Sequence, residues 1–368
     1  MIELSKLING KRKILVTGGA GFIGSTLIRR LLVETDSIIF NLDKIGYSSD
    51  LSSINKLISN KKEELSDRYS LLKVDLKDYS NTSDAIKEAD PDIIFHLAAE
   101  SHVDRSIDSP SAFINNNIVG TYNLLQASLI YFESLKRDNK DNFRFHHIST
   151  DEVYGSLGEK GSFNEGTKYD PRSPYSASKA ASDHLVNAWF HTYSFPIIVT
   201  NCSNNFGPWQ FPEKLIPLTI LKAISNKNIP LYGNGTNIRD WLYVEDHIDA
   251  LILSVIKGEI GKSYCIGGYG EKSNIEVVNK ICEYLDKKIP KSLSYKEQIK
   301  FVNDRPGHDW RYSIDSTLIT KELGWRPKNT FNEALFKTIQ WYLDNQDWCI
   351  KVQEKSGYNG ERLGVKSI

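Results

Sequence analysis

Several common class markers are absent from this sequence of 368 residues. Its 46 basic and 46 acidic side chains cancel, so nothing favours a broad surface for nucleic acid or an anionic membrane. No apolar run reaches the roughly 18 residues of a membrane span, and the opening stretch MIELSKLINGKRK lacks the continuous apolar core of a signal peptide. The four cysteines are scattered without a CxxC pair, which favours reduced, buried thiols over a metal site. We therefore expect a soluble, cytoplasmic protein without a bound metal.

The composition is that of an ordinary globular protein, with 40% hydrophobic and 25% charged residues. This balance argues against general disorder. A chain of this length can bury a large core and is expected to contain two or more domains.

A glycine-rich turn follows the first predicted strand. The apolar residues 13–17 lead into Gly18, Gly21 and Gly24, and apolar residues at helical spacing continue behind them. Glycines at such a turn let backbone N–H groups approach a diphosphate at the positive end of the helix. A second predicted strand ends at Asp43, where an acid can accept hydrogen bonds from an adenosine ribose. A glycine turn with a chance acid is the alternative, but the full combination favours a dinucleotide site.

The charge at Asp43 indicates which dinucleotide is bound. A carboxylate there repels the 2′-phosphate of NADP, so we expect NAD, although the adjacent Lys44 weakens the argument. Asp75 ends the next predicted strand, residues 71–74, and is a candidate contact to the adenine.

Strands and helices continue to alternate along the first half of the chain. Residues 93–99 form an apolar run typical of a strand buried on both faces, and they open into the polar cluster 100–105. A helix over 115–131 and a strand over 143–148 follow. This order predicts a doubly wound, parallel Rossmann-type α/β sheet with ligands at the carboxyl ends of its strands. We assign residues 10–205 and 238–268 to this NAD-binding domain, and 206–237 and 269–350 to a smaller, discontinuous α/β domain that binds the substrate.

Five candidate catalytic residues lie near the centre of the chain: Thr150, Asp151, Glu152, Tyr175 and Lys179. Tyr175 and Lys179 are four residues apart, so they share one face of a helix that begins with a Ser-Pro pair. A phenol has a pKa near 10, and cationic charge from Lys179 and an oxidised nicotinamide would favour the phenolate. Downstream of a dinucleotide loop, the pair indicates alcohol oxidation by hydride transfer, with Thr150 hydrogen-bonding the same substrate oxygen.

Asp151 and Glu152 exceed what simple alcohol oxidation requires. Adjacent carboxylates supply a general acid and a general base when their environments separate the two pKa values. A solvated acidic turn is the alternative, and in this context we favour catalysis.

Nearly the whole chain, from about residue 12 to 350, resembles the dTDP-glucose 4,6-dehydratases of the extended short-chain dehydrogenase/reductase family. The matching segments are TGGAGFIGS, HLAAESHVDRSI, HISTDEVYG, SPYSASKAASDHLV, TNCSNNFGPWQFPEKLIP, RDWLYVEDH and DRPGHDWRY. The triplet TDE resembles that of these dehydratases. It differs from 4-epimerases, which lack the acid pair, and from GDP-mannose dehydratases, whose triplet resembles TSE.

The resemblance implies a three-step reaction. Tyr175 takes the proton of the sugar's 4-hydroxyl while hydride passes from carbon 4 to NAD. Glu152 then removes the proton on carbon 5, and Asp151 protonates the departing 6-hydroxyl. Return of the hydride to carbon 6 leaves dTDP-4-keto-6-deoxyglucose, and NAD stays bound throughout.

The same resemblance, together with the patterns above, assigns the binding residues. For NAD they are Gly18, Gly21, Phe22, Ile23, Gly24, Asp43, Lys44, Asp75, Leu76, Ala98, Ala99, Ser101, Asn116, Tyr175, Lys179 and Asn205. For the nucleotide-sugar they are His102, Thr150, Asn204, Lys214, Leu215, Pro230, Tyr232, Arg239, Asn274, Asp304, Arg305 and His308.

Some local expectations accompany these assignments. Arg239 could instead pair with acids in the charged segment 240–247, and Asn274 is expected to cap a helix. Residues 317–345 predict two amphipathic helices, and the polar end from about residue 352 is expected to be loosely ordered. Asn116 stands where the family usually has threonine.

Two other functions remain open alternatives at this point. A UDP-glucose 4,6-dehydratase can share the TDE triplet, and a catalytically silent sugar-nucleotide-binding protein can share the fold. A homodimer that packs helices near 112–130 and 174–190 against their symmetry mates is implied by the resemblance only.

Overall fold

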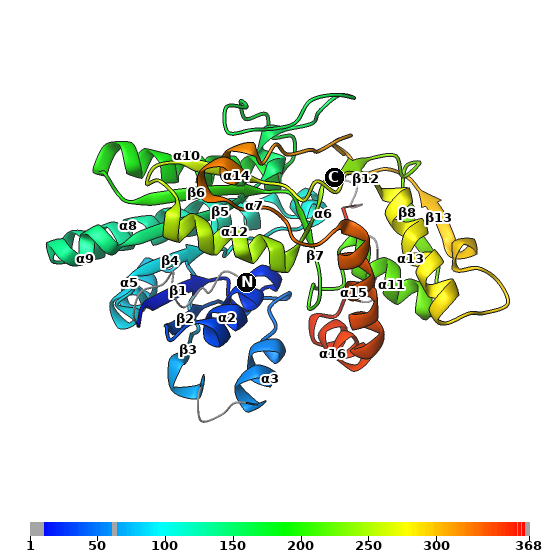
Figure 1. The fold of residues 1–368 in the computed structure, drawn as a ribbon, viewed down its shortest axis with the longest axis horizontal. Coiled ribbons are helices and arrows are strands. Elements are labelled where there is room, and N and C mark those ends of the chain that lie inside the picture. The colour runs from blue at the N-terminus through cyan, green and yellow to red at the C-terminus, as the bar shows by residue number, and fades with distance from the viewer. Residues whose placement is uncertain (1–10, 61–64, 359, 362, 365–368) are drawn as a thin grey trace.

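The computed structural model describes residues 11–60, 65–358, 360–361 and 363–364. Residues 1–10, which include most of the stretch considered for a signal peptide and the predicted start of the first domain, lie outside this description. Figure 1 shows a sheet half on the left and a smaller half on the right, where α11, α13, α15 and α16 lie.

A seven-stranded sheet forms the sheet half. Its strand order is β11-β6-β5-β4-β1-β2-β3, and every neighbouring pair is parallel. The doubly wound α/β sheet predicted from the sequence is therefore confirmed. The strands are β1 (Lys13–Thr17), β2 (Ile38–Leu42), β3 (Tyr69–Leu72), β4 (Ile93–His96), β5 (Arg144–Thr150), β6 (Ile197–Cys202) and β11 (Ser263–Ile266).

Helices cover both faces of this sheet because its strands are apolar on both sides. Ile14 and Val16 of β1 pack on one face, and Leu15 between them packs on the other. The first face carries α2 (Phe22–Glu34), α3 (Ser52–Asn60), α12 (Val244–Lys257) and α14 (Thr317–Leu323). The second carries α5 (Tyr79–Ala89), α8 (Gly120–Ser134) and α10 (Pro174–Tyr193).

The smaller half has an apolar core of its own. Four helices build it: α11 (Leu215–Ile224), α13 (Asn274–Lys288), α15 (Phe331–Asp344) and α16 (Gln346–Ser356). Three strand pairs accompany them: parallel β8 (Ile229–Tyr232) with β13 (Ile299–Val302), antiparallel β9 (Ile238–Arg239) with β12 (Lys272–Ser273), and parallel β7 (Asn204–Phe206) with β10 (Trp241–Tyr243).

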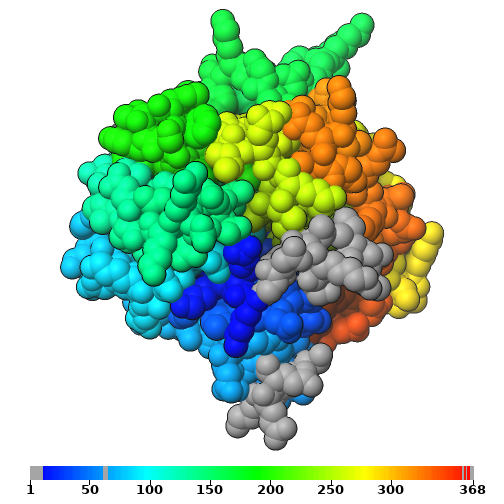
Figure 2. All heavy atoms as spheres, turned by 60° about the vertical axis from the view of Figure 1, so that its left-hand side comes forward, coloured from blue at the N-terminus to red at the C-terminus, as the bar shows by residue number. Residues whose placement is uncertain are grey.

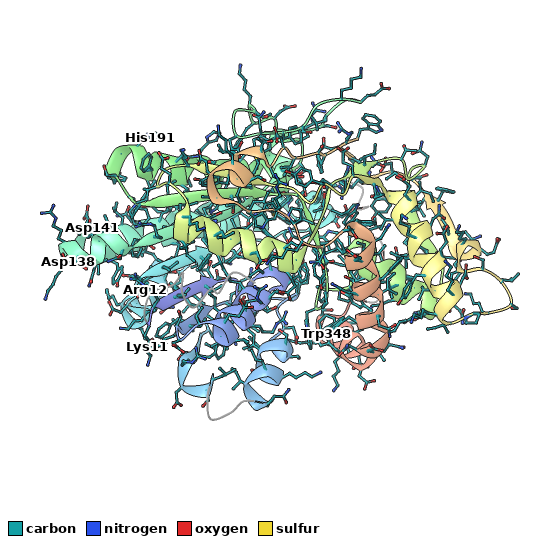
Figure 3. All side chains as sticks on the ribbon, in the orientation of Figure 1. Lys11, Arg12, Asp138, Asp141, His191 and Trp348 are labelled. Carbon is teal, nitrogen blue, oxygen red and sulfur yellow. The ribbon has the colours of Figure 1, made fainter. Side chains whose placement is uncertain are left out.

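The chain passes between the halves more than once. The helix α12 returns to the sheet half, in the middle of the face that Figure 2 shows. Ile319 and Leu323 of α14 also pack in the core of the sheet half, although they fall in the segment 269–350 that we assigned to the smaller domain. The short helix α9 (Arg137–Asn142) follows α8, and its Asp138 and Asp141 point into solvent (Figure 3).

The helix predicted over 115–131 is confirmed, as a π-helical first part, η2 (Ile114–Val119), that continues into α8. Two local expectations are corrected by the structure. Asn274 is the first helical residue of α13, and the cap is Ser273. The Ser273 hydroxyl accepts from the N–H of Glu276 at 3.4 Å, and the Glu276 carboxylate accepts from the N–H of Ser273 at 2.7 Å, which is a capping box.

The second correction concerns the described part of the polar end; residues 359, 362 and 365–368 lie outside the described residues. Residues 352–356 are the last part of α16, and Val352 is buried in the core of the smaller half. Trp348, labelled in Figure 3, donates from Nε1 to Asp50 of the sheet half at 2.9 Å. The helix is polar on its outer face, and its apolar residues pack in the core of the smaller half, which holds the helix in place.

Within the described ranges, no helix is long and apolar enough to cross a membrane. The four cysteines are buried and free.

Candidate active site

A cavity of about 480 Å³ lies between the two halves at the carboxyl edge of the sheet. In the sheet β1 has β4 on one side and β2 on the other, so successive connections leave it in opposite directions. Parallel sheets bind ligands in the crevice at such a switch point. The volume is in the range typical of small-molecule sites.

The glycine turn after β1 brings the N-terminus of α2 to the cavity. Gly18 has a φ of +71°, and a Cβ added there would lie 2.7 Å from the backbone of Ala98. A Cβ at Gly24 would lie 2.3 Å from the carbonyl oxygen of Gly18, so α2 packs directly on the turn. Gly21 caps α2 without any side-chain hydrogen bond. The uncapped, positive end of a helix at the cavity wall fits the diphosphate of a dinucleotide.

Asp43 follows β2 and organises the next loop while it lines the cavity. Its carboxylate accepts hydrogen bonds from the N–H of Ala20 at 3.0 Å, the N–H of Ile45 at 2.7 Å and the hydroxyl of Ser49 at 2.9 Å. Each carboxylate oxygen has two lone pairs, so the group can still accept from a ribose hydroxyl. The bonds fix the carboxylate in place, which suits a position that must exclude a 2′-phosphate.

Lys44 weakens the argument for NAD less than its sequence position suggested. Its ammonium donates to Glu100 at 2.7 Å and to the side-chain oxygen of Asn116 at 2.9 Å. The positive charge is thus balanced by a carboxylate. Asn116, which replaces the threonine usual in the family, takes part in this arrangement.

The helix α10 carries Tyr175 and Lys179, and its start is fixed by a second capping box. The Ser173 hydroxyl accepts from the N–H of Ser176 at 3.0 Å, and the Ser176 hydroxyl accepts from the N–H of Ser173 at 2.9 Å. The cap and the proline at the first turn were predicted correctly. Lys179 reaches under the sheet edge and donates to the carbonyl oxygen of Ile148 at 2.9 Å.

Tyr175 is a neutral phenol in the protein by itself. Burial raises its pKa well above the ordinary value, and Glu152 and Cys202 raise it further, while a hydrogen bond with Thr150 opposes them. Burial lowers the pKa of Lys179, and Asp183 opposes that decrease. Ionisation of Tyr175 therefore depends on positive charge brought into the cavity, as expected for an oxidised nicotinamide.

The triplet Thr150-Asp151-Glu152 spans the end of β5 and a 3₁₀ turn, η3 (Asp151–Tyr154). The Thr150 hydroxyl accepts from the N–H of Glu152 at 3.3 Å and donates to Asp151 Oδ1, also at 3.3 Å. Thr150 and Glu152 line the cavity, whereas Asp151 lies behind its wall with 1% of its surface exposed. Asp151 Oδ2 has no hydrogen-bond partner among the described residues.

The two adjacent acids have different electrostatic surroundings. Burial raises the pKa of Asp151 well above its ordinary value, and the neighbouring Glu152 adds to the increase. Burial also raises the pKa of Glu152, but Arg305, Lys214 and Arg239 oppose it. Asp151 is therefore the acid that holds a proton more firmly, and Glu152 is the one that cations stabilise as a carboxylate.

Two of these cations, Lys214 and Arg239, are held by neutral partners, whereas Arg305 pairs with the Asp104 carboxylate at 2.8 Å. Lys214 donates to the carbonyl oxygen of Ser101 at 2.8 Å. Arg239 donates to the carbonyl oxygen of Asp309 at 2.9 Å, and its guanidinium lies 4.3 Å from the ring centre of Tyr312. Guanidinium groups held by neutral partners are well suited to a diphosphate.

The acids of segment 240–247 have other partners than Arg239. Asp240 accepts from the N–H groups of Gly268 at 2.9 Å and Gly270 at 2.8 Å, and Asp246 accepts from Lys328 and Asn329. The alternative of an internal ion pair for Arg239 is therefore not what the structure shows.

Several buried polar atoms of cavity-lining residues have no hydrogen-bond partner within the described ranges. They include His102 Nδ1, Asn204 Oδ1, Asn205 Oδ1 and Arg305 Nε. Burial lowers the pKa of His102 to about 4, so it is a neutral imidazole near neutral pH. Unsatisfied buried polar groups are costly in a folded protein, and a polar ligand in the cavity would satisfy them.

The structure brings nearly all predicted site residues to this one cavity. The exceptions are Asp151 and Asp304. The residues placed there are Gly18, Gly21, Phe22, Ile23, Gly24, Asp43, Lys44, Asp75, Leu76, Ala98, Ala99, Ser101, His102, Asn116, Thr150, Glu152, Tyr175, Lys179, Asn204, Asn205, Lys214, Leu215, Pro230, Tyr232, Arg239, Asn274, Arg305 and His308.

Asp304 acts through a neighbour instead of lining the wall. Its carboxylate oxygen lies 2.6 Å from His308 Nδ1, and it also accepts from the N–H of Arg305 at 2.8 Å. Asp304 thereby orients the two residues beside it that do line the cavity.

Sequence reasoning missed an ion-pair cluster that joins the two halves. Glu213 lies 3.0 Å from Arg105 Nε and accepts from the Tyr47 hydroxyl at 3.1 Å. The Arg105 guanidinium lies 4.0 Å from the centre of the Tyr47 ring. Tyr47 belongs to the loop of residues 44–50, which we call the cofactor loop, and Lys355 of α16 donates to the Ser49 carbonyl of the same loop at 3.0 Å. The Arg105–Glu213, Tyr47–Glu213 and Lys355–Ser49 partners are more than a hundred residues apart, so local patterns give no signal for them.

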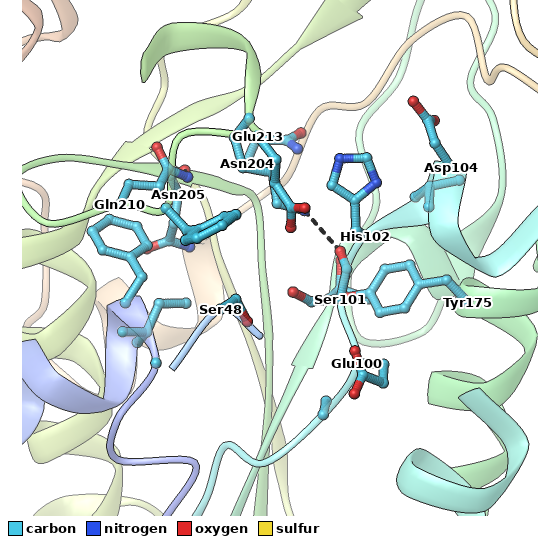
Figure 4. A pocket seen from close by; sticks show the side chains of 18 of the residues that line it. Ser48, Glu100, Ser101, His102, Asp104, Tyr175, Asn204, Asn205, Gln210 and Glu213 are labelled. Carbon is cyan, nitrogen blue, oxygen red and sulfur yellow. Dashed lines mark hydrogen bonds between the residues drawn. The ribbon is translucent and has the colours of Figure 1, made fainter. Parts of the chain in front are cut away.

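Other lining residues were also missed. Figure 4 shows Ser48, Asp104 and Gln210 among the side chains around the cavity, with Asp104 next to His102. Asp104 pairs with Arg305 at 2.8 Å and accepts from the Tyr232 hydroxyl at 2.8 Å. Residues of the chain's end also line the cavity, namely Tyr358, Gly360, Glu361 and Leu363.

Comparison with known proteins gives consistent matches over nearly the whole chain. The sequence model of the family described as GDP-mannose 4,6 dehydratase matches residues 15–338. The dTDP-glucose 4,6-dehydratase of Salmonella typhimurium is 52% identical over 354 residues, which cover 94% of this chain and 96% of that protein.

Two solved structures carry the same fold with ligands. The dTDP-glucose 4,6-dehydratase of Bacillus anthracis in complex with NAD superposes with a TM-score of 0.81, at 40% identity, over 92% of this chain and 99% of that one. The enzyme of Streptomyces venezuelae, with NAD and a second ligand, TYD, bound, gives a TM-score of 0.83 at 36% identity over the same shares.

Proposed function

The chain belongs to the family of the dTDP-glucose 4,6-dehydratases, and on that premise we propose how its own residues convert dTDP-glucose into dTDP-4-keto-6-deoxyglucose and water. NAD, when bound, accepts a hydride from carbon 4 of the sugar and returns it at carbon 6. The residues fit this cofactor at the glycine turn, at Asp43 and at the strand ends that line the cavity. The observation that carries the mechanism is the difference in surroundings between Asp151 and Glu152.

Tyr175 is the base for the 4-hydroxyl. It lines the cavity together with Thr150, which can bind the same sugar oxygen, and with Lys179. Because Tyr175 is protonated in the protein alone, it becomes a base only when positive charge is present beside it. This requirement couples proton removal to an oxidised cofactor and prevents a premature loss of the proton.

The elimination of water needs a carboxylate and a carboxylic acid together. Glu152 lines the cavity, and the three cations around it favour the anion that removes the proton from carbon 5. Asp151 is held in the neutral form by burial and by the charge of Glu152, so it can protonate the departing 6-hydroxyl. Its free Oδ2 lies behind the wall, so we infer that the Asp151 side chain turns toward the cavity when the substrate is bound.

The nucleotide and the diphosphate are assigned to the smaller half. Lys214, Arg239 and Arg305 supply three positive charges, and Asn204 supplies an unpaired amide oxygen. Leu215 and Pro230 provide apolar wall next to these charges.

We also propose a homodimer through α8, η2 and α10. Several large apolar side chains on these elements are exposed: Ile114 at 51%, Tyr122 at 45% and Ile130 at 50%. These three residues lie on η2 and α8, and Figure 2 shows this teal segment beside the green α10. Exposed apolar patches of this kind mark interaction sites. Sedimentation as a monomer at micromolar concentration would contradict the dimer.

The cytoplasmic location also stays a proposal, supported by the four free, buried thiols.

The decisive experiment uses the purified protein without added NAD. It is incubated with dTDP-glucose and, separately, with UDP-glucose, and the products are analysed by mass spectrometry and by the ultraviolet absorbance of the 4-keto sugar in alkali. We expect dTDP-glucose to lose one water rapidly and UDP-glucose to react more slowly or not at all. Absence of conversion of either sugar, even after NAD is supplied, would refute the function.

A further inference from the structure

Asp183 is a buried carboxylate that the mechanism above does not use. It lies on α10 four residues after Lys179, and its side chain is fully buried, with 0% of its surface exposed. Four side chains lie within hydrogen-bond distance of it. His147 Nε2 lies 2.9 Å from Oδ1, and Oδ2 accepts from Ser149 at 2.8 Å, Tyr169 at 2.9 Å and Asn201 at 3.2 Å.

These partners connect Asp183 to every segment that carries the catalytic groups. Ser149 immediately precedes Thr150 on β5, and Asn201 of β6 also donates to the Thr150 carbonyl oxygen at 3.3 Å. Tyr169 lies in the connection between the acid triplet and α10. A change at Asp183 therefore affects both the end of β5 and the helix that holds Tyr175.

The charge of Asp183 also has one obvious recipient. Lys179, one turn earlier on α10, is buried, and its ammonium reaches a backbone carbonyl and no carboxylate. The other titratable groups that face Lys179 are His147 of β5, His96 of β4 and Cys202 of β6.

Those neighbours carry no compensating charge near neutral pH. Burial lowers the pKa values of His96 and His147, which leaves both imidazoles neutral. Burial raises the pKa of Cys202 to about 12, which leaves a thiol. Tyr169, on the far side of Asp183, is a phenol because burial raises its pKa. Burial would also raise the pKa of Asp183, but His147, through its hydrogen bond and its electrostatic effect, and then the charge of Lys179 lower it overall.

We propose that Asp183 is a positioning residue for catalysis: it is the buried counter-ion of Lys179, and it ties the end of β5, with Thr150, to the helix that carries Tyr175. Two opposite charges one helical turn apart stabilise one another strongly where water is excluded. The four donors satisfy the carboxylate, so it can remain an anion in the core.

The first test is the pH dependence of NAD reduction in the holoenzyme after dTDP-glucose is added, measured before elimination in the Glu152→Gln background. Asp183→Asn keeps the size and removes the charge. Loss of the Asp183 charge, one helical turn away, should lower the pKa of Lys179 by about one to two units. We therefore expect the alkaline limb of the profile to move to lower pH by about that amount, and Asp183→Glu to restore part of the shift.

A matched control removes one hydrogen bond and keeps the charge. Tyr169→Phe deletes one of the donors to Oδ2, and it is expected to leave the alkaline limb in place even if the rate falls. An unchanged limb in Asp183→Asn, or the same displacement in Tyr169→Phe, would overturn the assignment.

A second test needs no substrate, so it stands apart from the proposed reaction. The melting temperatures of Lys179→Met, Asp183→Asn and the double variant form a double-mutant cycle. Lys179→Met alone leaves an unpaired buried anion, so we expect it to lower the melting temperature more than it does in the Asp183→Asn background. Additive changes would contradict the coupling of the two charges even if the dehydratase activity is confirmed. Coupling in a protein without activity would support the two charges as partners and refute the proposed function.

Discussion

The two sides of the cavity are built on different principles. On the cofactor side, the residues that line the cavity are close together in sequence. The glycine turn and the start of α2 follow β1, and Asp43 follows β2. On the substrate side, partners come from remote parts of the chain. The Asp104–Arg305 pair spans 201 positions and the Arg105–Glu213 pair spans 108. The cofactor side thus depends on backbone geometry, and the substrate side depends on the folding of two halves against each other.

The largest effect is expected where the two sides meet. Glu152→Gln removes the base for carbon 5 and keeps the shape of the side chain. Addition of dTDP-glucose should still reduce the bound NAD, seen as NADH absorbance, while product formation falls about 10²- to 10⁴-fold. Normal turnover in this variant would refute the role of Glu152, and loss of NAD reduction would show that it also acts in the first step.

One added methyl group at Gly18 should disrupt the binding of NAD. Gly18→Ala places a Cβ 2.7 Å from the Ala98 backbone, at a φ of +71°. Left-handed backbone costs about 1–2 kcal/mol for a residue with a Cβ, before the clash is counted. We expect the protein to be purified with little NAD and to melt at a lower temperature. The control is Gly158→Ala, which lies outside the cavity and where no described atom lies within 4 Å of the new Cβ. Equal NAD content in wild type and Gly18→Ala would contradict the binding of NAD at the glycine turn.

The substrate side should be weakened without loss of NAD. Asp104→Asn removes the carboxylate charge that pairs with Arg305. Because the pair is largely buried, water cannot replace that charge, and Arg305 is left without a counter-ion. We expect the KM for dTDP-glucose to rise about tenfold, or about 1.4 kcal/mol, with the NAD content unchanged. Parallel losses of NAD and of substrate affinity would show that the two sides are not separable.

The pH profile tests the division of labour between the two acids. The elimination rate should fall as the pH drops through the raised pKa of Glu152, because the base is then protonated. It should fall again as the pH rises through the still higher pKa of Asp151, because the acid then loses its proton. Asp151→Asn should lower the rate at all pH values and remove the alkaline limb. A profile without an alkaline limb in the wild type would argue against Asp151 as the acid.

The smallest effect is expected at Lys44. Its charge is balanced by Glu100, so Lys44→Ala should change the preference for NAD over NADP only a few-fold. Asp43→Ala is the contrasting variant, and it should raise the relative affinity for NADP more. A strong loss of NADP binding in Lys44→Ala would show that this ammonium faces the ribose after all.

The same contrast explains how far the sequence could be read. The strand ends, the glycine turn and the cap at Ser173 were placed from local patterns, and so were the five candidate catalytic residues, because each feature lies within one or two elements. Asn274 was misplaced as a cap because serine and asparagine stand side by side, and only the geometry selects Ser273. The Tyr47–Glu213–Arg105 cluster and the lining residues after 357 gave no local signal, since their roles arise from tertiary contacts.

The cofactor loop carries one further consequence. Its residues are held by Glu213 and by α16, both from the smaller half, so opening the loop means loosening contacts on both sides of the molecule. A cofactor seated beneath it would be enclosed by the same contacts that shape the sugar site. The hydride taken from a sugar would then return to the same sugar. The reaction would not depend on the ratio of oxidised to reduced nucleotide in the surrounding cell.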